Sequence, residues 1–257
     1  MNTKINTREY TKEKIIEGVK LGITGVNGLM AEGRGEAFGL LMGKDISPPT
    51  MTSIKAAVAS LILSKHPVIS VNGNTAAIVP KDLVLLSKEL NVPLEVNLFY
   101  RTEERVGRVV EHLKKNGALV VLGERKKSIR LAEIDHARGI VDERGIYGAD
   151  TVLLALEDGD RTKKLKDMGK TTIAIELNPF SRTARDASIT IIDNVVSVIL
   201  EMVRCARVMK RTKRGELERL VEGFKNEETL LDQRRIMAKN MRDLITFNLT
   251  PGKEFLS

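Results

Sequence analysis

The chain contains no tryptophan and a single cysteine, and only 4% of its 257 residues are aromatic. One cysteine, Cys205, excludes an internal disulfide and any metal site built from cysteine pairs. The scarcity of aromatic side chains leaves few stacking platforms for single-stranded nucleic acid. No apolar run approaches the roughly 18–20 residues of a membrane-spanning helix, so we expect no membrane span.

Apolar and basic residues are both plentiful. Hydrophobic residues make up 42% of the chain, which is enough for a sizeable core and argues against global disorder. The first residues lack an apolar stretch, so we expect no secretory signal and a cytoplasmic protein. Lys and Arg outnumber Asp and Glu by 42 to 34, a net charge of +8. Such a surplus suits anionic partners: nucleic acid, anionic lipid or phosphorylated small molecules.

Three stretches differ in pattern. Residues 1–65 are expected to form an N-terminal helical segment packed on the core, and residues 195–257 long C-terminal helices. Residues 66–194 alternate short apolar runs with amphipathic segments, which predicts a Rossmann-like α/β core with a mostly parallel sheet. The expected strands are Pro67–Val71, Leu94–Phe99, Ala118–Leu122, Thr151–Leu156, Thr171–Glu176 and Ile189–Ile192. The expected helices between them are Lys81–Leu90, Glu103–Lys115 and Asp160–Met168.

The C-terminal helices each carry an apolar stripe, and these stripes have two interpretations. They pack on their own subunit, or they form a homodimer interface. The second stripe comprises Leu230, Leu231, Met237, Met241 and Leu244.

Familiar nucleotide and metal motifs are missing. The segment from Gly39 to Lys44 is one residue short of a P-loop, and Asp45 replaces its Ser or Thr. The three histidines, at positions 66, 112 and 136, show no metal-ligand spacing, and the sequence identifies no metal ligands.

Polar residues instead follow the expected strands, where ligands bind in open α/β sheets. Asn72 and Asn74 lie in a turn whose amides can contact substrate; a hairpin-type turn before residues 76–79 is the alternative. After the next strand, Thr102 is a candidate helix cap, which places Arg101 beside the positive end of that helix as a candidate substrate ligand.

Acidic residues follow the strand that ends near residue 156. The three carboxylates of Glu157, Asp158 and Asp160 can hold Mg²⁺ or accept a proton, and Asp158 and Asp160 are the candidate catalytic residues. The alternative is a helix N-terminus rich in acids, with Asp160 as its cap.

The richest segment runs from residue 176 to residue 185. Its arginines can bind phosphate oxygens through bidentate forks, and small hydroxyl groups beside them complete such a site. Asn194 then begins a long helix whose amides can face a phosphate, and Arg34 lies between two glycines.

At these blocks the sequence resembles the archaeal phosphopantothenate synthetase family, the 4-phosphopantoate–β-alanine ligases. The resemblance rests on blocks at residues 13–18, 33–38, 70–74, 97–105, 136–139, 156–161, 178–185 and 193–194. It implies a Rossmann-like homodimer that condenses 4-phosphopantoate with β-alanine, with ATP as co-substrate and Mg²⁺, on the route to coenzyme A.

The family's ATP-contacting positions correspond to a defined set in this chain. They are Lys12, Arg34, Glu176, Leu177, Asn178, Arg182, Thr183, Asn194 and Val195. Lys12 stands where the family has arginine, which keeps the charge but lacks the bidentate fork. The family is expected to work through an acyl adenylate, and so to need no covalent nucleophile.

Two other functions remain open on the sequence alone. One is a basic nucleic-acid-binding protein that uses the arginines and lysines between residues 204 and 214. The other is a nucleotide-binding protein without catalytic activity.

Overall fold

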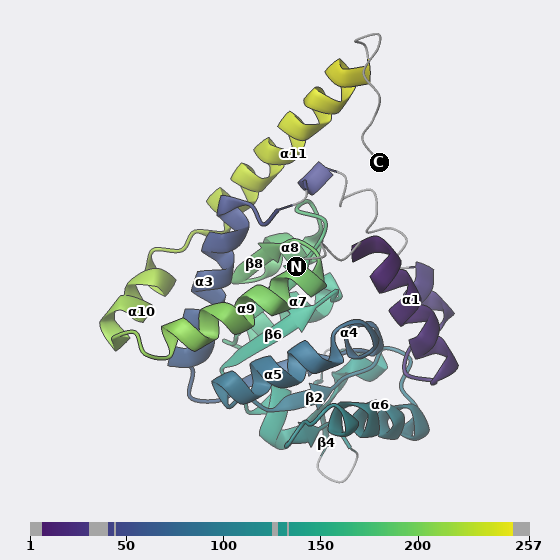
Figure 1. Ribbon diagram of the computed structural model, residues 1–257. Helices are drawn as coiled ribbons and strands as arrows, with labels where there is room; N and C mark the ends of the chain where they lie inside the picture. Colours follow the sequence, from purple (N-terminus) through teal and green to yellow (C-terminus); the bar gives the residue numbers. More distant parts are fainter. Residues whose placement is uncertain (1–6, 31–40, 44, 125–127, 133, 249–257) are drawn as a thin grey trace.

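A six-stranded parallel sheet lies at the centre of the fold (Figure 1). The computed structural model describes residues 7–30, 41–43, 45–124, 128–132 and 134–248. The strands are β1 (Pro67–Val71), β2 (Leu94–Val96), β3 (Val121–Leu122), β6 (Thr151–Ala155), β7 (Thr171–Glu176) and β8 (Ile189–Ile192). Their order is β3-β2-β1-β6-β7-β8, and neighbouring strands all pair in parallel, which confirms the predicted Rossmann-like sheet. In this order the chain reverses direction across the sheet between β1 and β6, the topological switch point.

Helices cover the sheet on both faces. They are α1 (Thr7–Lys20), α3 (Pro48–Leu63), α4 (Gly73–Ile78), α5 (Pro80–Leu90), α6 (Glu103–Lys115), α7 (Gly159–Asp167), α8 (Arg182–Asp186), α9 (Val195–Met209), α10 (Arg214–Glu222) and α11 (Asn226–Asn248). Along β6, Leu153 and Ala155 face the larger core cluster, whereas Val152 and Leu154 face a second cluster on the other side. Because both faces are buried, the strands read as continuous apolar runs in the sequence.

An insertion between β3 and β6 covers part of the second face. It contains a short antiparallel pair, β4 (Ser128–Arg130) and β5 (Ile140–Asp142), a 3₁₀ turn at Ala137–Gly139 and a π-helical turn at Glu143–Tyr147. Glu95 on β2 anchors this insertion, because its fully buried carboxylate accepts hydrogen bonds from the backbone amides of Asp142 (3.0 Å) and Ile146 (2.6 Å). Gly145 leaves room for this carboxylate, since a Cβ atom at its position would overlap a Glu95 carboxylate oxygen.

Most of the expected elements are confirmed, and the others are corrected. The bounds of β1, β7, β8 and α6 are those predicted, whereas β2 and β3 are shorter than expected. The alternative prediction of a hairpin-type turn after β1 is wrong. Asn72 instead begins helix α4 through a capping box, in which its side chain accepts from the Thr75 amide while the Thr75 hydroxyl bonds the Asn72 backbone.

The C-terminal helices differ in how much they bury. The apolar stripe of α9 is buried against α3 and α5. Only the first half of α11 packs similarly, through Leu230 and Met237, while Leu231, Met241 and Ile245 are exposed. The far end of α11 extends away from the body of the molecule in Figure 1. Within the described part of the chain, we find no helix with the length and apolar character to span a membrane.

Candidate functional site

Asn72 joins the two sides of the topological switch point. It follows β1 and caps α4, and its Nδ2 donates a buried hydrogen bond of 2.7 Å to the carbonyl of Ala155, the last residue of β6. One predicted substrate-binding residue thus lies where the fold places ligand sites. Its side chain is 8% exposed and fixed by its neighbours.

The turn after β6 directs one carboxylate inward and the next toward solvent. Leu156 has a positive φ of 52°, and the Glu157 side chain that follows is only 3% exposed. The Glu157 carboxylate forms an ion pair with the Arg138 guanidinium and accepts hydrogen bonds from the Arg161 guanidinium and from the amide of Asp158 (2.9 Å). The end of β6 is therefore followed by a buried carboxylate that pairs with two arginines.

Asp158, rather than Asp160, caps helix α7. Its backbone is extended and its carboxylate accepts from the Asp160 amide at 2.8 Å, which corrects the expectation that Asp160 is the cap. Asp160 lies in the first turn, and its carboxylate forms a two-point ion pair with Arg182 at 2.6 and 3.2 Å. Both side chains are largely exposed. A predicted catalytic residue and a predicted ATP ligand therefore contact each other.

The ends of β7 and β8 bring most of the predicted ATP ligands together. Glu176 ends β7, Asn178 and Thr183 lie in the segment that follows, and Asn194 caps α9 after β8. The Thr183 hydroxyl donates to the carbonyl of Glu157 at 2.9 Å, which ties this segment to the end of β6. Val195 is 4% exposed and packs in the main core, so only its backbone can face a ligand.

Two carboxylates at these ends are protonated more readily than usual. Burial raises the pKa of Glu176 to about 7, although hydrogen bonds from the Asn178 and Leu177 amides act against it. Burial raises the pKa of Asp193 to about 6 in the same way, against a hydrogen bond from the Asn194 amide. Desolvated acids of this kind cluster at functional sites.

Asn74 and Arg101, the other predicted substrate ligands, bind neighbouring protein groups. The Asn74 side chain accepts from the Thr24 hydroxyl (2.5 Å) and donates to the Gly28 carbonyl (3.1 Å). Arg101 is 4% exposed and donates to the Gly123 carbonyl at 2.6 Å, beyond β3. Thr102 caps α6 as expected. In this arrangement, Asn74 holds residues 24–28 and Arg101 holds the end of β3.

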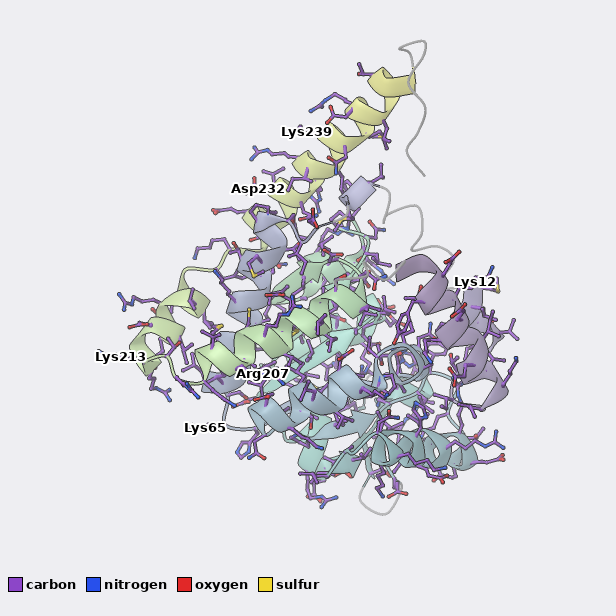
Figure 2. The ribbon with its side chains drawn as sticks, viewed as in Figure 1. Lys12, Lys65, Arg207, Lys213, Asp232 and Lys239 are labelled. Carbon is purple, nitrogen blue, oxygen red and sulfur yellow. The ribbon has the colours of Figure 1, made fainter. Side chains whose placement is uncertain are left out.

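Two further predicted ATP ligands belong to the N-terminal segment. Lys12 lies exposed on α1, across the view from Lys213 and Lys239 (Figure 2). Arg34 falls outside the described residues. In the part of the chain that is described, no three His, Cys, Asp or Glu side chains are grouped as a metal site. The described residues thus offer no grouped ligands for a resident metal, and Mg²⁺ carried on nucleotide phosphates needs few protein ligands.

The sequence reasoning missed the side chains that the insertion brings to the strand ends. His136 stacks on Phe99 with ring centroids 4.9 Å apart, and its Nε2 lies 3.8 Å from an Asp158 carboxylate oxygen. The Arg138 guanidinium lies 5.8 Å from the centroid of the Phe99 ring. The block at residues 136–139 is one of those that carry the family resemblance. Its position in the fold was not predictable, because the strands on either side of it are very short.

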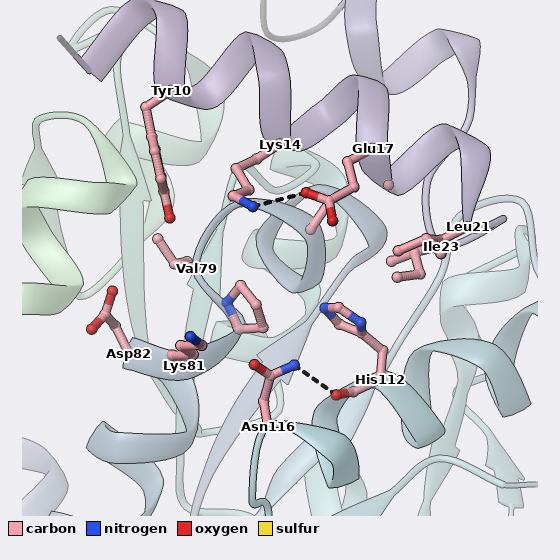
Figure 3. Close-up of a pocket in the computed structure, with 13 residues that line it drawn as sticks. Tyr10, Lys14, Glu17, Leu21, Ile23, Val79, Lys81, Asp82, His112 and Asn116 are labelled. Carbon is pink, nitrogen blue, oxygen red and sulfur yellow. Dashed lines mark hydrogen bonds and ion pairs between the residues drawn. The ribbon is translucent and has the colours of Figure 1, made fainter. Parts of the chain in front are cut away.

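A cavity of about 330 Å³ lies elsewhere, beneath α1 (Figure 3). Its polar lining includes the Lys14–Glu17 ion pair (2.8 Å) and Asn116, which donates to the His112 carbonyl. It is lined by α1, the C-terminal end of α4, the first turn of α5 and the last turn of α6. None of the predicted site residues lines it. The candidate functional site is therefore the set of strand ends, where most of the predicted residues gather.

Comparison with known proteins gives one consistent result. The profile of the phosphopantothenate/pantothenate synthetase family matches residues 49–240. A 4-phosphopantoate–β-alanine ligase of Thermococcus onnurineus is 48% identical over 92% of this chain and 89% of its own. Proteins of the same name from Methanosarcina mazei and Methanospirillum hungatei are 46% and 41% identical, over 85% and 83% of this chain and 86% of each relative. The chain therefore belongs to the phosphopantothenate/pantothenate synthetase family and is an enzyme of the ligase class.

Proposed function

We propose that this enzyme joins 4-phosphopantoate to β-alanine, with ATP as co-substrate, to make 4′-phosphopantothenate for coenzyme A. The observation that carries the proposal is the 48% identity, over 92% of the chain, to a relative named for this reaction. Several phosphate-recognising side chains at the strand ends also suit it. We further propose a cytoplasmic homodimer.

ATP is assigned to the ends of β7 and β8. In this proposal Glu176 bonds the ribose hydroxyls, as acids at strand ends do in Rossmann folds. Asn178, Thr183 and the N-terminus of α9 at Asn194 offer polar groups to the rest of the nucleotide. Arg182 supplies a bidentate fork for phosphate oxygens once it exchanges Asp160 for the ligand.

The chemistry requires an activated carboxylate. An amine cannot expel oxide from a carboxylate, so the carboxylate oxygen of 4-phosphopantoate attacks the α-phosphorus of ATP and pyrophosphate leaves. The amine of β-alanine then attacks the acyl carbon of the adenylate, an amide forms, and AMP leaves with the original carboxylate oxygen. Mg²⁺ supplies positive charge to the phosphates in this scheme.

Asp158 and Asp160 are assigned to the second step. They stand at the end of β6, between the proposed nucleotide site and the ends of β1 and β2. We propose that one of them accepts the proton of the β-alanine ammonium or positions the metal. Replacement of both by alanine should lower turnover by at least about 10-fold, since general-base catalysis contributes about 10² to 10⁴. Unchanged turnover in the double variant would remove this assignment.

The direct test is incubation of the full chain with ATP, Mg²⁺, 4-phosphopantoate and β-alanine. We expect 4′-phosphopantothenate and AMP in equal amounts, detected by mass spectrometry. Arg182→Gln should raise the KM for ATP, whereas Arg185→Gln, an exposed arginine of the same helix, should not. Absence of product over a range of pH and temperature would refute the ligase assignment and leave a nucleotide-binding protein without catalysis.

The basic C-terminal helices offer weak support for nucleic-acid binding. Arg207 and Lys210 both pair with Glu89 at 2.7 Å, and Arg214 pairs with Glu218 at 2.8 Å. Figure 2 shows Lys213 and Lys239 on separate parts of the surface. Basic side chains that are paired with carboxylates or spread over the surface attract a polyanion only weakly. A strongly salt-dependent affinity for DNA or RNA would contradict this interpretation.

A further inference from the structure

Buried polar atoms without a hydrogen-bond partner gather around the ends of β1, β2 and β6. They are Asn97 Oδ1, His136 Nδ1, Arg138 Nε, Arg161 Nε and Arg161 Nη2. Native proteins leave few such atoms, because each costs the desolvation of a polar group. Three of the five are guanidinium donors. A group with several acceptor oxygens is the ligand that such donors need.

Arg138 spans the topological switch point. Asn97, which follows β2, holds the Arg138 backbone by donating from Nδ2 to its carbonyl at 3.2 Å. The Arg138 side chain reaches the Glu157 carboxylate, which follows β6. Because β1 lies between β2 and β6, the side chain crosses the end of β1. The guanidinium is therefore at the position where a Rossmann-like sheet binds its ligands.

The two arginines of the cluster keep their charge. Glu157 pairs with both guanidinium groups, and Glu95, a second buried carboxylate whose pKa burial raises to about 7, acts on Arg161. Burial lowers the pKa of Arg138 to about 9 and of Arg161 to about 10. Both therefore remain charged at neutral pH. The next carboxylate, Asp158, is 29% exposed and already accepts from the Asp160 amide. Arg161 is wholly buried, whereas the Arg138 side chain is 10% exposed and the His136 side chain 28% exposed.

An apolar surface lies beside this charge. Phe99 and Tyr100 are 40% and 59% exposed, with ring centroids 5.0 Å apart, and Phe99 also contacts His136 and Arg138. The acid substrate of the proposed reaction has a phosphate, a carboxylate and a hydroxyl around a carbon with two methyl groups. The rings suit the methyl groups and the guanidinium suits an anion.

We propose that Arg138 binds the phosphate of 4-phosphopantoate and that Glu157 holds the Arg138 guanidinium in position. This inference rests on the proposed function. The carboxylate must meet the nucleotide at the β6–β8 side of the sheet. The phosphate then falls one or two strand spacings away, about 5–10 Å, toward β1 and β2 where Arg138 lies. Specificity for the phosphorylated acid over pantoate thus comes from Arg138.

The test compares binding of 4-phosphopantoate and of pantoate to the full chain by calorimetry. Arg138→Gln should lower the affinity for 4-phosphopantoate by about 10- to 100-fold, because hydrogen bonds to a charged group are lost. The affinities for ATP and for pantoate should stay within about 2-fold of the wild-type values. Arg138→Lys keeps a cation beside Glu157 and should show an intermediate loss. Arg144→Gln, an exposed arginine of the same insertion, should bind all three as the wild type does. Equal losses for 4-phosphopantoate and pantoate, or no loss, would overturn the assignment.

A second measurement uses the unmodified protein and so does not depend on the folding of a variant. Inorganic phosphate should compete with 4-phosphopantoate, and pantoate should still bind in its presence. Phosphate that competes with ATP alone would overturn the assignment. If the enzyme makes product and these binding results fail, only the role of Arg138 is wrong. If it neither binds 4-phosphopantoate nor makes product, the proposed function fails too.

Discussion

At the scale of single residues, two carboxylates three positions apart face opposite environments. Glu157 is buried between two arginines, whereas Asp160 pairs with Arg182 at the surface. Removal of one partner from a buried ion pair costs about 3–5 kcal/mol, because a charge is left uncompensated. An exposed pair contributes less than about 1 kcal/mol.

Glu157→Gln should therefore lower the free energy of unfolding by about 3–5 kcal/mol. Asp160→Asn, the matched control, should lower it by less than about 1 kcal/mol. Urea unfolding followed by circular dichroism measures both. Similar small losses in the two variants would show that Glu157 does not compensate the buried arginines.

Glu176 makes stability depend on pH in an unusual direction. Its pKa is about 7 in the folded enzyme against an ordinary value of 4.5, since burial disfavours the charged form. Folding therefore takes up a proton between pH 4.5 and 7. Stability is highest below this window and falls as the pH rises through it, by at most about 3 kcal/mol for this group.

Glu176→Gln should remove this contribution. The free energy of unfolding should fall less between pH 5 and pH 7 in the variant than in the wild type, as measured by urea unfolding at the two values. Glu95 has the same raised pKa and remains in both proteins, so some pH dependence should persist. Parallel pH profiles for variant and wild type would contradict the assigned protonation of Glu176.

At the scale of elements, the strands were predictable because their apolar runs are continuous, and β1, β7 and β8 have the expected bounds. Helix α4 was missed because Asn72-Gly73-Asn74 has the composition of a turn, and only the tertiary fold decides between a turn and a cap. The ribbon β4–β5 was missed because each strand has three residues. The Arg138–Glu157 contact joins residues 19 apart along the chain, and local patterns do not encode such partners.

Asn72 supports α4 and the switch point together. Asn72→Ala should cost about 2 kcal/mol, since it removes a helix cap worth about 1 kcal/mol and a buried hydrogen bond of similar value. Thr102→Ala removes only the cap of α6 and should cost about 1 kcal/mol. Urea midpoints compare the two. Equal losses would show that the bond to Ala155 contributes nothing.

At the scale of the whole molecule, the outer half of α11 leaves apolar side chains exposed. Met241 is 49% exposed and Ile245 56% exposed, one turn apart on a helix that extends from the body. We propose that a second copy of the chain covers them. Replacement of both by glutamate should convert a dimer to a monomer in light scattering after gel filtration. Arg242→Glu, at a nearby exposed position, should leave the mass unchanged. An unchanged mass in the variant with glutamate at 241 and 245 would show that these side chains do not form the dimer interface.

The account as a whole holds that the strand ends activate a carboxylate by adenylyl transfer before β-alanine attacks. The most direct test uses 4-phosphopantoate with ¹⁸O in its carboxylate, together with ATP, Mg²⁺ and β-alanine, and follows the label by mass spectrometry. One labelled oxygen in AMP for each amide formed is the predicted result. Label in inorganic phosphate, with ADP as the nucleotide product, would contradict the account, because the intermediate would then be an acyl phosphate.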